Sequence, residues 1–196
     1  MNTFALFVAF ISLVGTYQKT EETKSFAVTR DGDDLGELIS KRTIEGTQTT
    51  YLNITKIRAK LIGEIRVTYR IESVFKNKEL ESSTALITVN EETHSKSKTK
   101  RVGNRYEYYK NDKLKSTING VIYFTNTMLV YNEPVGNSSS YAEEAGVFNP
   151  ITKPTAGVYE RPNSRGRKTV YHYQNAELKR MVVDVGLATL EMKSKP

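Results

Sequence analysis

Few residues of this sequence have the types and spacing that catalysis or metal binding requires. The two histidines, His94 and His172, lie far apart, and neither has a second histidine or a carboxylate at the spacing of a metal-ligand set. The chain has no cysteine and no Gly-x-Ser-x-Gly motif, so the familiar nucleophile arrangements are missing. Asp31-Gly-Asp-Asp34 lacks the spaced ligands of a calcium loop and is interpreted as a hairpin tip. These residues predict no metal site, no cofactor and no catalytic residue.

Three lysines form the one patterned charge feature. Lys96, Lys98 and Lys100 alternate with serine and threonine, which places their ammonium groups on one side of a strand. The stripe is either a binding surface for an anion or a protein partner, or an edge strand protected against pairing with other chains. We favour the edge strand. The net charge of +7 is interpreted as a source of solubility and not as a sign of nucleic-acid binding, because no block of five like charges occurs.

The elements that must carry these residues are predicted to be strands. Residues 65–75 read IRVTYRIESVF, in which apolar and polar residues alternate. Because successive side chains of a strand point to opposite faces, this pattern predicts a half-buried strand. A helix would scatter the same apolar residues around its circumference.

Three segments share the form aromatic-x-Asn-x-x-Leu, at residues 75–80, 109–114 and 173–178. Asparagine tolerates the left-handed backbone of tight turns, so each segment predicts a hairpin tip with its aromatic and leucine side chains facing each other across the strands. Further turn signals divide the chain into nine to eleven strands. The fold class is therefore expected to be all-β, as an antiparallel meander curled into a barrel or half-barrel.

The middle of the chain differs from this pattern. Residues 121–131, VIYFTNTMLVY, form the most apolar run after the N-terminal segment and predict either packed core or the lining of a ligand cavity. Ser140 and Glu143 then have the spacing of a capping box, and Gly146 suits the residue after a helix end. We expect one short helix near residues 140–145.

The N-terminus carries an uncharged apolar stretch over Phe4–Val14. It is too short to span a membrane and has the length of a secretory signal peptide's hydrophobic region. We expect residues 1–16 to be a signal peptide, 17–196 to be one β-rich domain without a stable transmembrane span, and the location to be periplasmic or secreted. Without cysteine, a lipid anchor through that residue is excluded. The alternative is a buried N-terminal strand or helix of a cytosolic fold.

Three stretches resemble an uncharacterised family of secreted β-rich proteins of Bacteroidota. They are the hairpin from Phe26 to Glu37, the segment Thr127–Gly136 with the stretch after it, and the closing hairpin at 171–178. The resemblance spans the whole mature chain, and its motifs imply structure but no catalytic residue. The layout is also similar to half-barrels that carry lipids or lipoproteins through the bacterial periplasm, which implies an apolar ligand.

These observations favour a non-catalytic envelope protein that binds a lipid or another apolar small molecule in a curved sheet. One alternative is an interaction module that binds an envelope protein or an anionic polymer through Lys96, Lys98 and Lys100. A second is a hydrolase, because a pair of carboxylates brought together only by folding is invisible in sequence. The expected lining residues of the ligand site are Tyr69, Ile71, Phe75, Tyr123, Phe124 and Met128.

Overall fold

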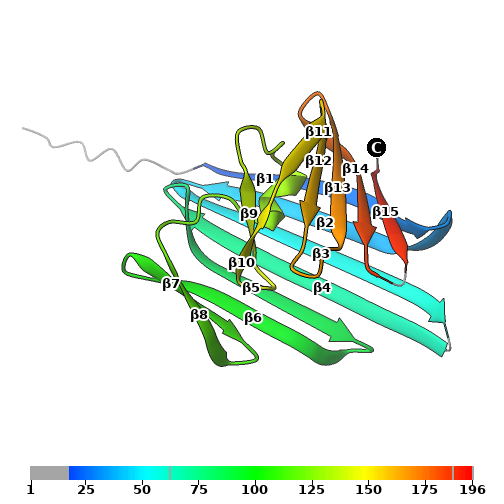
Figure 1. Ribbon diagram of the computed structural model, residues 1–196, viewed down its shortest axis with the longest axis horizontal. Helices are drawn as coiled ribbons and strands as arrows, with labels where there is room; N and C mark the ends of the chain where they lie inside the picture. The colour runs from blue at the N-terminus through cyan, green and yellow to red at the C-terminus, as the bar shows by residue number, and fades with distance from the viewer. Residues whose placement is uncertain (1–17, 62, 187, 196) are drawn as a thin grey trace, which may run out of the picture.

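The computed structural model describes residues 18–61, 63–186 and 188–195, which contain fifteen β strands and one 3₁₀ helix. Thirteen strands form one antiparallel sheet in the order β11-β12-β13-β14-β15-β1-β2-β3-β4-β5-β6-β7-β8 (Figure 1). The predicted all-β meander is confirmed, with more strands than expected. In chain order the strands of this sheet are β1 Lys19–Arg30, β2 Asp33–Glu45, β3 Gln48–Leu61, β4 Gly63–Lys76, β5 Glu79–Val89, β6 Glu92–Val102, β7 Arg105–Lys110, β8 Lys113–Asn119, β11 Thr152–Thr155, β12 Val158–Pro162, β13 Lys168–Gln174, β14 Glu177–Asp184 and β15 Thr189–Ser194.

The long strands β2, β3 and β4 form one side of the curved sheet, which we call the wide arm, and β13, β14 and β15 form the other side, which we call the narrow arm (Figure 1). In β4 the alternation places Val67 and Ile71 on one face, half-buried, and leaves Arg66 and Arg70 exposed on the other. β3 pairs with β4 along its whole length, from Gln48 opposite Lys76 onward. The strand predicted over residues 65–75 is therefore confirmed, and its apolar face is the one that the protein buries.

The three repeated hairpin tips adopt the predicted geometry. Asn77, Asn111 and Asn175 each have a positive φ of about 50°, and the residue that follows each of them also has a positive φ, between 61° and 67°. The aromatic and leucine residues pair across each hairpin, and each pairing follows a one-residue register shift. The pairs are Phe75 with Leu80, Tyr109 with Leu114, and Tyr173 with Leu178.

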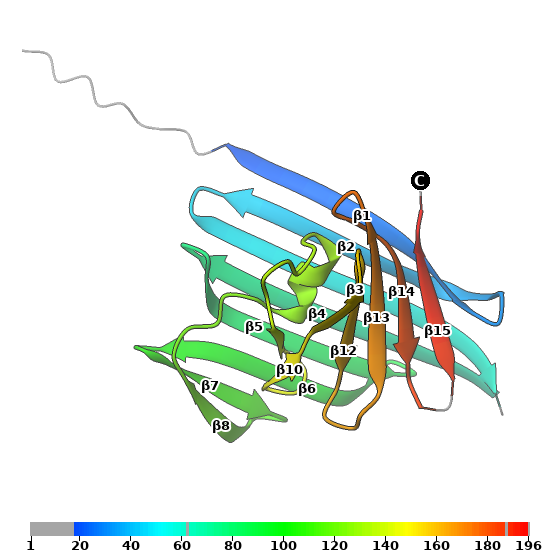
Figure 2. The same ribbon diagram turned by 45° about the horizontal axis from the view of Figure 1, so that its top comes forward.

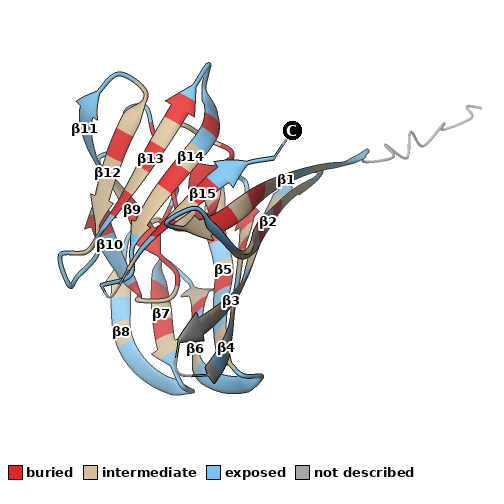
Figure 3. Cartoon of the chain, turned by 90° about the vertical axis from the view of Figure 1, so that its right-hand side faces the viewer, coloured by how far each residue is buried: buried red, intermediate tan, exposed pale blue. Residues whose placement is uncertain are grey.

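The sheet curls without closing, because its edge strands β8 and β11 do not pair with each other. Seen end-on in Figure 3, both edges lie on one side, and buried residues line the interior of the two arms. Edge strand β11 contains Pro154, which lacks a backbone N–H and so discourages pairing with another chain. The expectation that the lysine stripe lies on an edge strand is wrong: β6 pairs with β5 and with β7, and Lys98 faces Thr84 and Tyr109.

The apolar run after β8 enters the space between the arms (Figure 2). Its helical turn, η1, spans Asn126–Val130 and packs against β3, β4 and β14. The helix expected near residues 140–145 is not present: Ser139–Ala142 forms strand β9, a turn follows, and Val147–Pro150 forms β10, which pairs with β9. We name residues 121–151 the plug.

Tyrosine hydroxyls hold the plug to the sheet through backbone carbonyls. Tyr173 of β13 donates to Leu129 O at 2.5 Å, and Tyr131 of the plug donates to Glu22 O of β1 at 3.0 Å. At the other end, Ile122 O accepts the backbone N–H of Leu80 at 2.9 Å. These bonds satisfy polar groups that lie inside an otherwise apolar core. Among the described residues, no helix is long and apolar enough to cross a membrane.

Candidate functional site

A cavity of about 400 Å³ lies between the plug and the inner faces of the two arms. This volume falls within the range of about 300–1,000 Å³ that is typical of small-molecule sites. Because the sheet is not closed, the plug does not have to fill the whole space between the arms. The cavity is the part of the described interior that packing leaves open to a ligand.

Two largely apolar walls flank the cavity. The wide arm contributes residues of β2, β3 and β4, and the narrow arm contributes residues of β13, β14 and β15. On the wide arm the apolar lining side chains are Leu38, Ile57, Tyr69 and Ile71, with the polar Asn53 and Thr55 beside them. On the narrow arm the apolar lining side chains include Tyr171, Met181, Val183, Leu190 and Met192, with the polar Thr169 beside them.

A buried carboxylate of the plug positions a residue that lines the cavity. Glu143 is fully buried, and its Oε1 accepts hydrogen bonds from Ser73 Oγ at 2.9 Å, Thr127 Oγ1 at 2.8 Å and the Thr127 backbone N–H at 3.1 Å. Ser97 Oγ of β6 donates to Glu143 O at 2.9 Å. This residue therefore ties η1 to β4 and β6, and it fixes the position of Thr127, which lines the cavity.

Four charged side chains also line the cavity, and two of them, of opposite sign, interact electrostatically. These two are Glu144 of the plug and Arg161 of β12. Arg161 Nε donates to the hydroxyl of Tyr171 at 3.3 Å, whereas Arg161 Nη1 and Glu144 Oε2 are buried and have no hydrogen-bond partner among the described residues. Burial raises the pKa of Glu144, and the neighbouring Glu143 adds to the effect. An apolar cavity with two unsatisfied polar groups is suited to an amphipathic ligand.

The sequence comparison assigns this fold to a family. A family model described as a domain of unknown function, DUF6134, matches residues 26–195, which include every strand that lines the cavity. The chain belongs to the DUF6134 family. No curated protein matches the sequence.

A solved structure shares the architecture of this DUF6134 domain. It is the crystal structure of a β-barrel-like protein of the domain of unknown function DUF1849 from Brucella abortus, with a TM-score of 0.53 and 13% sequence identity. The match covers 88% of this chain and 94% of that chain. At this identity the similarity concerns the fold, and it supports a β-barrel-like architecture for the DUF6134 domain.

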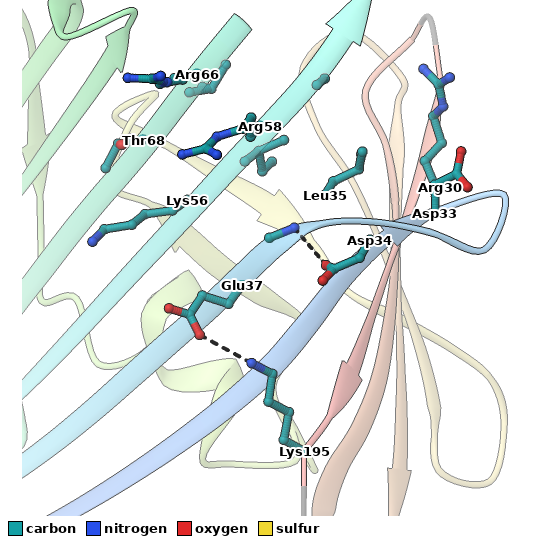
Figure 4. A pocket seen from close by; sticks show the side chains of 14 residues that line it. Arg30, Asp33, Asp34, Leu35, Glu37, Lys56, Arg58, Arg66, Thr68 and Lys195 are labelled. Carbon is teal, nitrogen blue, oxygen red and sulfur yellow. Dashed lines mark hydrogen bonds and ion pairs between the residues drawn. The ribbon is translucent and has the colours of Figure 1, made fainter. Parts of the chain in front are cut away.

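A second, larger pocket of about 730 Å³ lies where the β1–β2 hairpin separates from β3 (Figure 4). Charged side chains of both signs surround it, and Lys195 bonds to Glu37 at 3.2 Å. Lys56, Arg58 and Arg66 are exposed to solvent. Exposed and partly paired charges of this kind contribute little to the binding of a ligand. The cavity between the arms is therefore the better candidate site, although its volume is smaller.

The residues predicted to line a ligand site lie in different environments in the DUF6134 domain. Tyr69 and Ile71 line the cavity. Phe75 is buried against Tyr51, at 5.8 Å between ring centroids, and Phe124 and Met128 pack in the plug's core. Tyr123 is 59% exposed. Apart from Tyr123, the apolar sequence patterns selected residues that contribute to the core or the cavity, but such patterns do not distinguish packed core from open cavity.

The other expected sites stay separate from the cavity. Lys96 pairs with Asp112 at 2.5 Å and Lys100 with Glu107 at 3.1 Å, so two lysines of the stripe already have partners. The apolar segment Phe4–Val14 lies outside the described residues. Glu144 and Arg161 were missed because no local spacing connects them. A weak signal was present, since Glu143-Glu144 is an acidic pair directly after buried Tyr141 and Ala142.

The raised pKa of Glu144 predicts how stability depends on pH. The folded protein holds this proton more tightly than the unfolded chain, so the free energy of unfolding falls as pH rises from the ordinary value of 4.5 to the raised pKa. Each unit of the shift corresponds to about 1.4 kcal/mol. We expect Glu144→Gln to match the wild type near pH 4 and to exceed it at pH 7.

Urea denaturation at several pH values measures this difference. Glu160→Gln is a suitable control, because Glu160 is near Arg161 in sequence but forms an ion pair with Lys168 at the surface. A Glu144→Gln advantage that is constant across pH would contradict the assignment of the effect to a proton on Glu144.

Proposed function

We propose that this DUF6134 domain is a non-catalytic binding protein that holds a lipid acyl chain, or an apolar ligand of similar size, in the cavity between its arms. The observation that carries the proposal is the cavity of about 400 Å³ with apolar walls on both arms. Burial of an acyl chain there contributes about 0.8 kcal/mol for each CH₂ group removed from water.

We also propose that the protein is exported to the cell envelope. The apolar segment at Phe4–Val14 supports export, and a carrier for a water-insoluble ligand has a clear use between membranes. The absence of a recognisable nucleophile or metal motif from the sequence favours binding over catalysis.

A fluorescent apolar probe tests the proposal directly. The purified protein is titrated with N-phenyl-1-naphthylamine, whose emission rises in an apolar site. We expect saturable binding of one probe per protein. Ile71→Trp should weaken it by narrowing the cavity. The matched control is Ile39→Trp, because Ile39 is 37% exposed and does not line the cavity.

Equal binding by the wild type and both variants would place the probe elsewhere and contradict the proposal, as would the absence of saturable binding. Mass spectrometry of lipids that co-purify with the wild type, and not with Ile71→Trp, then identifies the natural ligand.

A further inference from the structure

The cavity has a polar end that apolar packing does not explain. Arg161 and Glu144 come from β12 and from the plug, and both line the cavity wall. Each has a buried polar atom without a partner: Nη1 in Arg161 and Oε2 in Glu144. A buried donor or acceptor without a partner costs about 1–3 kcal/mol. Two such atoms at the same end of one cavity indicate a position for a polar group of a ligand.

The guanidinium of Arg161 is oriented by the fold. Its Nε bonds to Tyr171 Oη at 3.3 Å, and Tyr171 is itself buried on β13. This bond leaves the two terminal nitrogens available for an acceptor. A guanidinium with two free nitrogens matches the two oxygens of a carboxylate, and it stays charged in a protein interior.

Glu144 is a second ionisable group in the cavity wall. Burial raises its pKa, and Glu143 acts in the same direction, whereas Arg161 and Lys110 oppose it. A second guanidinium, that of Arg167, lines the cavity with Nη1 bonded to Val185 O at 2.7 Å. The charged lining of the cavity therefore consists of two arginines, Arg161 and Arg167, and two acids, Glu144 and Asp184, while the Glu143 carboxylate acts on Arg161 from the plug.

We propose that the cavity selects single-chain acyl ligands with a carboxylate head group, which Arg161 binds. The inference rests on the proposed function, because it assigns the head-group end of the same cavity. The acyl chain would lie between the walls formed by Ile71 and Met181.

Three probes with the same ten-carbon chain test the inference by isothermal titration calorimetry at pH 7: decanoate, decanol and decylammonium. We expect the wild type to bind decanoate most tightly and decylammonium most weakly. Arg161→Gln should weaken decanoate binding by roughly tenfold to a hundredfold, the equivalent of one lost charged hydrogen-bond pair, and weaken decanol binding much less, because the hydroxyl head group is uncharged. Arg165→Gln is the control, because Arg165 is exposed in the loop after β12 and does not line the cavity.

The outcomes separate the two proposals. If none of the three probes binds to the wild type, the proposed function fails. If decanol binds as tightly as decanoate, the cavity takes apolar chains and the carboxylate assignment is overturned. The comparison of probes on the wild type needs no variant, so the test holds even if Arg161→Gln does not fold. Arg161→Lys keeps the charge without the planar fork and should retain part of the preference for decanoate.

Discussion

Glu143→Ala is expected to lower the free energy of unfolding by about 3 kcal/mol or more, because it removes the acceptor of three buried hydrogen bonds and each donor left without a partner costs about 1–3 kcal/mol. The donors are Ser73 Oγ, Thr127 Oγ1 and the backbone N–H of Thr127. Thr127 Oγ1 lies 3.1 Å from Ser73 Oγ, so one hydroxyl can still donate to the other and two donors lose their acceptor. The alanine also leaves a void in a closely packed region. Since Glu143 fixes η1 against β4, the loss should also loosen the cavity wall at Thr127 and weaken probe binding.

Glu143→Gln is the matched control. The amide oxygen of glutamine can replace Oε1 and accept the same three hydrogen bonds, and the NH₂ group takes the position of Oε2, which has no partner in the wild type. We expect its free energy of unfolding to stay within about 1 kcal/mol of the wild type, because the hydrogen bonds are retained. Guanidinium denaturation measures both variants. Equal losses in both would mean that the hydrogen bonds to Oε1 are not what stabilises the plug.

Gly36→Ala is expected to be the second severe substitution. Gly36 has a φ of +142°, and a Cβ added there would lie 2.1 Å from the carbonyl oxygen of Lys56. That oxygen belongs to β3, which pairs with β2 at this point, so it cannot move away without breaking the pairing. The backbone conformation alone costs a residue other than glycine about 1–3 kcal/mol, and the clash adds to this cost.

Gly32→Ala distinguishes the cost of backbone strain from the cost of a steric clash. Gly32 has a φ of +92°, but nothing lies within 4 Å of the position of its Cβ. Thermal unfolding of both variants should show a clearly larger decrease in Tm for Gly36→Ala. Equal decreases would attribute the whole effect to backbone strain and none to contact with β3.

Local features of the fold were predictable from the sequence because their causes are local. The alternation in β4 and the asparagine tips at 77, 111 and 175 determine strand faces and turns without help from distant residues. The helix expected near residues 140–145 is absent for the opposite reason. Ser140 Oγ donates to Asn126 Oδ1 at 2.7 Å, and Glu143 bonds to Ser73, so both capping residues bond to distant partners instead of to a helix terminus.

The candidate site could not be predicted in the same way. Tyr69 and Ile71 were expected at a ligand site, and they do line the cavity. Arg161 and Glu144 meet there only because the sheet curls and the plug turns back between its arms. Such proximity depends on strand order and curvature, and no spacing along the chain encodes either. The carboxylates and cations of a sheet protein of this kind are therefore best assigned from structure.

The pairing of β1 with β15 has a consequence for how the chain acquires its structure. Phe26 lies opposite Ser194, so the middle of the sheet joins residues from the two ends of the sequence. During synthesis β1 can pair with β2 early, but its other edge stays open until β15 leaves the ribosome. Contacts of such long sequence separation slow folding, with rates on the scale of milliseconds to seconds for β proteins. The part of this edge that β15 later covers, Phe26–Thr29, is meanwhile a surface on which a chaperone or a second chain can add a strand.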